Sequence, residues 1–209
     1  MSVLTLGSIR ARSARLAAVA GLVAAGALAS ACGSETMRQG QASSYLVIRA
    51  LEGASGADDS SQFTPVLRAD VRTKGGVFED NGRVVMTAAM KDVTNPTGPS
   101  TNNQITVTRY RVSFRRSDGR DRPGVDVPYA FDGGVTFTVA PDEEISVPFT
   151  LVRAQSKLEP PLSALAGAGG GVVISTLADV TFFGRDQTGR EVSVTGSISV
   201  NFADWADPE

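Results

Sequence analysis

Four arginines lie close together near the middle of the chain: Arg109, Arg111, Arg115 and Arg116. Side chains alternate across a β-strand, so Arg109, Arg111 and Arg115 share one face. Guanidinium groups bind phosphate and carboxylate through paired hydrogen bonds. The spacing therefore predicts an anion-binding stripe for phosphate or an anionic glycan. The alternative is a solvated strand face whose arginines pair with acids such as Asp118 or Asp142.

Two acidic clusters, Asp58-Asp59 and Asp142-Glu143-Glu144, carry oxygen atoms of the kind that bind Ca²⁺. Neither cluster has the alternating acids and the glycine of a calcium loop, so we interpret both as solvated turn residues. The glycine-rich segment Gly167–Gly171 lacks the Lys-Ser/Thr of a phosphate-binding loop and is interpreted as a linker. We expect no metal ion and no cofactor.

The chain has 209 residues, one Cys and no His. The absence of His excludes Ser-His-Asp and Cys-His relays, and a single Cys excludes internal disulfides and multi-cysteine metal sites. The formal charge of −2 offers no basic surface for nucleic acid. These counts favour a binding or structural role, and we do not expect an enzyme.

The single cysteine, Cys32, follows a segment typical of a signal peptide. The first 15 residues carry three arginines and no acid, and residues 16–31 form an uninterrupted run of small apolar residues. The run ends in Ala29-Ser30-Ala31-Cys32, which resembles the lipobox of bacterial lipoproteins. That family usually has Leu three places before the Cys, where this chain has Ala29. Ordinary secretory cleavage near Ala31 is the alternative.

The resemblance implies that residues 1–31 are removed and that Cys32 becomes a lipidated N-terminus. Acyl chains on Cys32 would anchor the protein to a membrane. Gly33 after the Cys resembles the pattern sorted to the outer membrane, which places the chain on its periplasmic face in a diderm host. Removing 31 of the 209 residues leaves 178, and losing three arginines and no acid changes the formal charge from −2 to −5.

The remaining sequence predicts an all-β fold. Residues 32–42 are small and polar and are expected to form a flexible tether, followed by a domain over residues 43–205 and a tail over 206–209. Short alternating segments separated by turn residues predict an antiparallel Greek-key β-sandwich, which resembles the immunoglobulin and fibronectin type III folds in architecture only. A lipocalin-like barrel is the alternative.

Several elements are predicted individually. Pro148 indicates an edge strand or a bulge, residues 172–184 a central strand, and Asn81-Gly82 a tight turn. Residues 158–168 are expected to form one helical turn between two sheets. In the last strand Val200 should face the core, and Ser199 should face water.

The aromatic residues bear on the function. Most occupy predicted core positions, and three remain as candidates for an exposed platform: Phe131, Phe183 and Trp205. Trp205 has the alternative role of capping one end of the sandwich. The leading hypothesis is a non-catalytic module that docks an envelope protein at a membrane surface. The second is a lipoprotein that binds a small anionic ligand or glycan. An exposed apolar patch or a long unpaired edge strand would favour docking, whereas a pocket bordered by Arg109 and Arg111 would favour the ligand.

Overall fold

A computed structural model describes residues 42–57, 62–92, 94 and 98–205 of the chain. The described residues belong to one compact unit. The signal peptide, Cys32, most of the predicted tether and the predicted tail lie outside the described residues.

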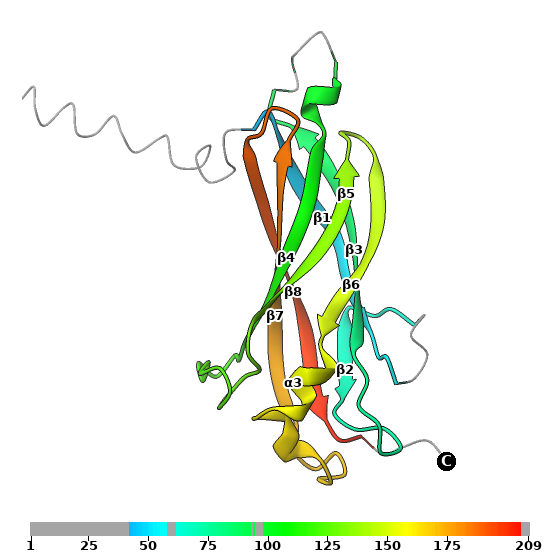
Figure 1. Ribbon diagram of the computed structural model, residues 1–209, viewed down its shortest axis with the longest axis vertical. Coiled ribbons are helices and arrows are strands. Elements are labelled where there is room, and N and C mark those ends of the chain that lie inside the picture. Colours follow the sequence, from blue (N-terminus) through cyan, green and yellow to red (C-terminus); the bar gives the residue numbers. More distant parts are fainter. Residues whose placement is uncertain (1–41, 58–61, 93, 95–97, 206–209) are drawn as a thin grey trace, which may run out of the picture. The chain divides into compact units, whose positions relative to one another are not determined.

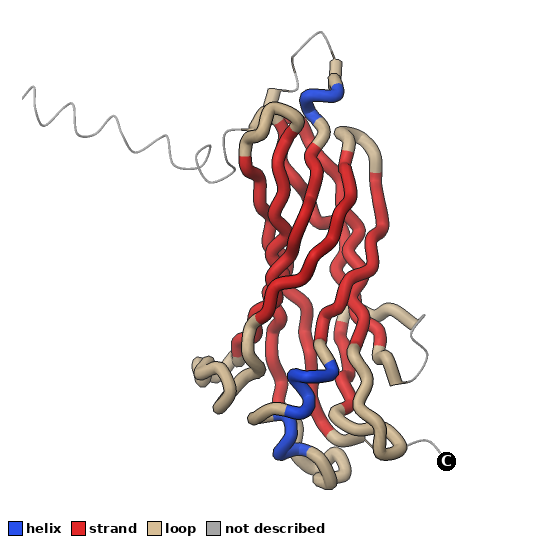
Figure 2. Tube along the Cα trace, viewed as in Figure 1, coloured by secondary structure: helices blue, strands red, loops and turns tan. Residues whose placement is uncertain are grey.

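Eight strands and three short helical turns make up the described part (Figures 1 and 2). The strands are β1 (Ser44–Ala54), β2 (Val66–Asp70), β3 (Asp80–Met90), β4 (Ile105–Arg115), β5 (Phe131–Val139), β6 (Glu144–Val152), β7 (Ile174–Asp186) and β8 (Glu191–Ala203). The helical turns are η1 (Thr101–Asn103), α3 (Ala154–Leu158) and η2 (Leu162–Leu165).

The strands form two packed sheets, which confirms the predicted β-sandwich. One sheet has the order β1-β3-β6, and the other has the order β2-β8-β7-β4-β5. The chain changes sheet at every connection except those between β4 and β5 and between β7 and β8, as in a Greek key.

One pairing differs from the antiparallel expectation. Strand β2 pairs with β8 in parallel, from Val66 opposite Ser199 to Asp70 opposite Ala203. Strand β2 continues in the direction of β1 but belongs to the other sheet (Figure 1). Because β8 runs the same way, the pairing is parallel.

The core lies between the sheets and is built from the inward residues of each alternating strand. Strand β8 buries Val192, Ile198, Val200 and Phe202, as its sequence predicts. Tyr110, Phe149 and Phe182 pack edge-on or tilted against each other, with ring centroids 5.2–6.1 Å apart. The prediction of an exposed Phe131 is wrong: it is 5% exposed. Its ring completes this cluster against Tyr110.

The predicted turn at Asn81-Gly82 is also wrong, because both residues lie in β3. Gly82 pairs with Gly53 on one side and with Phe149 on the other. A Cβ atom at Gly82 would lie 2.4 Å from the Phe149 ring. The glycine is required for the close approach of an aromatic ring and not for a turn conformation.

Two other predictions about individual elements are confirmed, and a third is confirmed in part. Pro148 lies in β6, at the edge of its sheet, which is where a residue without an N–H is tolerated in a strand. Strand β7 is central, between β8 and β4. The connection between β6 in one sheet and β7 in the other is helical as predicted, but it holds two helical turns, α3 and η2, and the first begins before residue 158.

The strand registers define two ends of the sandwich (Figures 1 and 2). At the end that we call N-terminal, Ser44 begins β1 opposite Met90, and the hairpin between β7 and β8 closes. At the opposite end, which we call distal, Arg115 ends β4 opposite Leu177. Three long connections emerge at the distal end: residues 71–79, 116–130 and 153–173.

Candidate functional site

Exposed apolar side chains gather in the connections of the distal end. Seven large hydrophobic residues among those described are strongly exposed: Val66, Phe78, Val125, Tyr129, Leu158, Val172 and Val173. All but Val66 belong to the three distal connections. Val125 and Leu158 are each 57% exposed. Contact surfaces between proteins typically have an apolar centre and a polar rim.

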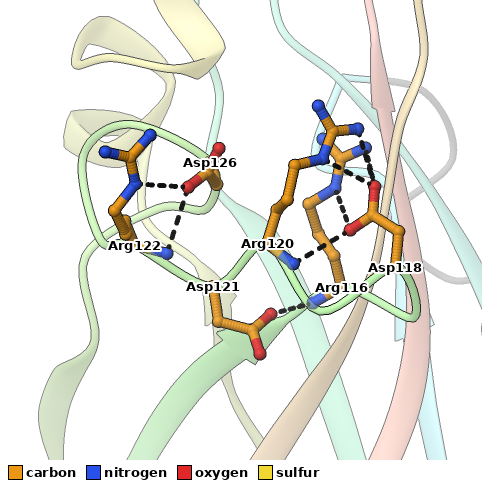
Figure 3. A network of polar contacts seen from close by, with 6 residues as sticks. All are labelled: Arg116, Asp118, Arg120, Asp121, Arg122 and Asp126. Atoms are coloured by element: carbon orange, nitrogen blue, oxygen red, sulfur yellow. Dashed lines mark hydrogen bonds and ion pairs between the residues drawn. The ribbon is translucent and has the colours of Figure 1, made fainter.

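The connection 116–130, which we call the distal loop, is held by a network of ion pairs (Figure 3). The Asp118 carboxylate accepts hydrogen bonds from the guanidinium groups of Arg116, at 2.8 Å, and Arg120, at 2.6 Å. Arg122 donates to the Asp126 carboxylate at 3.0 Å. Three arginines and three aspartates alternate here, so the loop presents charges of both signs.

Backbone contacts fix the same loop. The Arg116 N–H donates to the Asp121 carboxylate at 2.7 Å, and the Gly124 N–H donates to the Val127 carbonyl at 2.8 Å. Val127 is buried and anchors the loop in the core. Gly124 has a φ of 74°, and a Cβ there would lie 2.2 Å from the Tyr129 hydroxyl. The loop is therefore preorganised, with Val125 and Tyr129 exposed.

Two carboxylates of this network, Asp118 and Asp126, are held in their charged form. Hydrogen bonds from Arg116 and Arg120 lower the pKa of Asp118 well below its ordinary value. A hydrogen bond from Arg122 lowers the pKa of Asp126 in the same way, against a smaller opposing effect of burial. Both groups stay ionised at neutral and mildly acidic pH, so the loop keeps its ion pairs there.

The arginine stripe lies on the outer face of β4, on the side away from the buried Tyr110, Val112 and Phe114, as predicted. Arg111 contacts the Asp132 carboxylate at 2.7 Å, and Arg109 contacts it at 3.3 Å. The Asp132 carboxylate therefore neutralises part of the charge of these two arginines.

Arg115 pairs with Asp179 on the neighbouring strand at 2.6 Å. Burial raises the pKa of Asp179, but hydrogen bonds from Arg115 and Ser197 outweigh it and lower the pKa below its ordinary value. Arg109 also lies over the half-buried Phe183 ring, 3.7 Å from its centroid.

Sequence reasoning missed the acids that contact the stripe. Arg116 pairs with Asp118, one of the two acids expected, but Asp132 and Asp179 were not named. Asp132 lies directly opposite Arg111 in the register of β4 and β5. Asp179 is the one acidic residue within the otherwise apolar and hydroxylic run of 172–183. To predict that this aspartate lies beside an arginine, one must know how β4 and β7 are aligned with each other. Composition does not give this register.

Two hollows in the described surface lie away from the stripe. One, of about 290 Å³, is lined by residues that include Arg49 and the acidic cluster Asp142, Glu143 and Glu144. The other, of about 340 Å³, lies between β1 and β2 and includes Ser55, Thr64 and Arg68. Neither contains Arg109 or Arg111. No group of three or more potential metal ligands occurs among the described residues, and Asp58-Asp59 lies outside them.

Trp205 lies just beyond β8 and is half-buried. Its backbone N–H donates to the Asp70 carboxylate at 3.0 Å, and Arg68 lies over its ring, 4.2 Å from the centroid. These contacts hold the ring against the end of β2. This position fits the predicted capping role better than the role of an open platform.

The chain matches no known family, curated protein or solved structure. Within the described residues, no helix is long and apolar enough to cross a membrane. The predicted lipid attachment at Cys32 lies outside the described residues.

Proposed function

We propose that this chain is a lipid-anchored protein of the bacterial cell envelope whose β-sandwich is a non-catalytic docking module for another protein. One observation carries the docking role: six of the seven strongly exposed large hydrophobic residues in the described part belong to connections at the distal end. The chain enters the sandwich at the opposite end, where β1 begins at Ser44.

The anchor rests on the lipobox-like segment that ends at Cys32. Each acyl chain contributes about 0.8 kcal/mol per buried CH₂ group, so two or three chains hold a protein at a membrane without a spanning helix. With residues 33–42 as a tether, the N-terminal end of the sandwich would face the membrane. The longest strands have 13 residues. At a rise of about 3.3 Å per residue, such a strand carries the distal connections about 40 Å from the other end.

The chemistry of the distal end fits a protein better than a small anion. Val125 and Tyr129 are exposed on a loop whose charges alternate in sign, and Tyr and Arg are enriched in protein interfaces. A preorganised loop loses little conformational entropy on binding. The arginine stripe, in contrast, already has carboxylate partners and borders neither of the two hollows.

The docking surface is tested by the double substitution Val125→Ser and Tyr129→Ser in the full chain. Both side chains are exposed, so the melting temperature should stay within about 2 °C of wild type, as expected for surface changes. Recovery of a cross-linked envelope partner from intact cells should fall at least tenfold. Val66→Ser is the matched control, because it removes an exposed apolar residue outside the distal connections. An equal loss of partner recovery in the double variant and in Val66→Ser would contradict a distal docking surface.

The anchor is tested by Cys32→Ser. Without a thiol no thioether-linked lipid can form, so the variant should leave the membrane fraction, whereas wild type should remain in it. Fractionation with and without detergent, followed by immunodetection, makes the measurement. A Cys32→Ser protein that stays as firmly membrane-bound as wild type would overturn lipid anchoring.

A further inference from the structure

A fully buried ion pair lies near the distal end, between the start of β3 and α3. The Lys157 Nζ atom is 2.9 Å from Asp80 Oδ2, and both side chains are completely inaccessible to solvent. Asp80 begins β3 opposite Val152, and Lys157 follows five residues later on α3. The pair joins segments that are 77 positions apart in the sequence.

The surroundings of this pair offer its charged atoms few hydrogen bonds. The contact between Nζ and Oδ2 is short but lacks the orientation of a well-formed hydrogen bond, and neither atom has another hydrogen-bond partner among the described residues. The other carboxylate oxygen, Oδ1, accepts one hydrogen bond, from the Gly56 N–H at 3.2 Å. Removing two charges from water costs several kcal/mol per ion unless further hydrogen bonds compensate, and the described surroundings offer one.

The choice of lysine is informative. The chain contains 17 Arg and three Lys, and the surface pairs of the distal loop and of the β4 stripe all use Arg. Arginine is the usual partner in buried ion pairs because its fork binds carboxylate at two points. Lysine offers what arginine does not: an amine that becomes a nucleophile when it is desolvated and loses its proton.

We propose that Asp80 and Lys157 condense to an intramolecular amide bond in the folded protein. A proton first passes from the Lys157 ammonium to the Asp80 carboxylate, which gives a neutral amine and a carboxylic acid. The amine attacks Cγ of Asp80, the Nζ–Cγ bond forms, and the Cγ–Oδ2 bond breaks. Oδ2 leaves as water with the acid proton and one proton from Nζ, so the step needs no oxidant or other reactant.

The site supplies two conditions for this step. Burial raises the pKa of Asp80 to about 6, although Lys157 opposes the shift, so the acid form is accessible near neutral pH. The Gly56 N–H points at Oδ1, the oxygen that carries negative charge in the tetrahedral intermediate, and acts as a single oxyanion donor. Gly56 is required at this position, because a Cβ there would lie 1.8 Å from the Glu79 carbonyl oxygen.

The bond would also solve two physical problems. It converts two buried charges into one neutral amide, which removes the desolvation cost of the ions. It also ties the 153–173 connection to β3 covalently. The domain over residues 43–205 contains no Cys, so no disulfide is available for this purpose.

The test is peptide mapping of the protein purified from whole-cell detergent extracts, after denaturation and digestion with trypsin. We expect a branched peptide that joins Asp80 to Lys157, lighter by one water than its two linear parts, and no cleavage after Lys157. Lys157→Arg is the matched control, because it keeps the positive charge but removes the amine, and it should give only linear peptides. The proposal would be overturned if all of the purified wild-type protein gave linear peptides with a free Lys157 and an unmodified Asp80. This result does not depend on whether the Lys157→Arg variant folds.

Discussion

At the scale of single residues, the contact between Gly82 and Phe149 shows how a local sequence signal is overridden. Asn-Gly is a strong turn signal because glycine tolerates a positive φ. Gly82 uses a different property, the absence of a Cβ, to let the Phe149 ring lie on the strand. Sequence alone does not separate these two uses, because the ring comes from a strand 67 positions away.

This contact gives a stability prediction. Gly82→Ala places a methyl group where the Phe149 ring lies, and overpacking of this kind costs about 1–3 kcal/mol. Gly134→Ala is the matched control, since a Cβ there meets no atom within 4 Å and its φ is not positive. Urea unfolding of the two variants should show a loss for Gly82→Ala and a neutral or slightly stabilising effect for Gly134→Ala. Equal effects would mean that the ring does not cover Gly82.

The same scale explains why the polar contacts escaped prediction. The Asp80–Lys157 pair and the Asp132 and Asp179 contacts all join residues on different elements. Charge composition is compatible with many pairings, and only the register selects among them. The alternation of Arg109, Arg111 and Arg115 on one face, in contrast, follows from strand geometry alone and was predictable.

At the scale of elements, alternation made the strands predictable. Apolar and polar residues alternate wherever one face of a strand is buried and the other is solvated. Strands β4 and β8 follow this pattern along most of their length. The parallel pairing of β2 was not predictable, because a five-residue strand carries too short a pattern to define its partner or direction. Phe131 was placed outside because it begins β5 directly after a loop, where no alternation precedes it.

Strand β8 provides the matching test. Val200 is fully buried, and its neighbour Ser199 faces the other side of the sheet and is partly exposed. Val200→Asp buries an unpaired carboxylate and should cost more than about 4 kcal/mol, enough to unfold a domain of ordinary stability. Ser199→Asp should change the free energy of unfolding by less than about 1 kcal/mol. Thermal melts in which the two variants lose equal stability would reverse the assignment of faces.

At the scale of the whole molecule, the proposed function assigns a different task to each end of the sandwich. The chain enters at Ser44, at the N-terminal end, and the exposed apolar residues lie in the connections of the distal end. The sequence predicted the sandwich, which the structure confirms, but not the position of the exposed apolar residues at one end. The apolar residues concerned come from three separate connections, and only the strand order brings those connections to one end.

The most direct test of this difference between the ends is site-specific photo-cross-linking in intact cells. A photoreactive amino acid replaces Tyr129, in the distal loop, or Gln187, in the exposed hairpin at the N-terminal end. We predict a discrete protein adduct from position 129 that is lost when Val125→Ser is added, and no such adduct from position 187. The same protein adduct from both positions, or none from position 129, would contradict docking through the distal end.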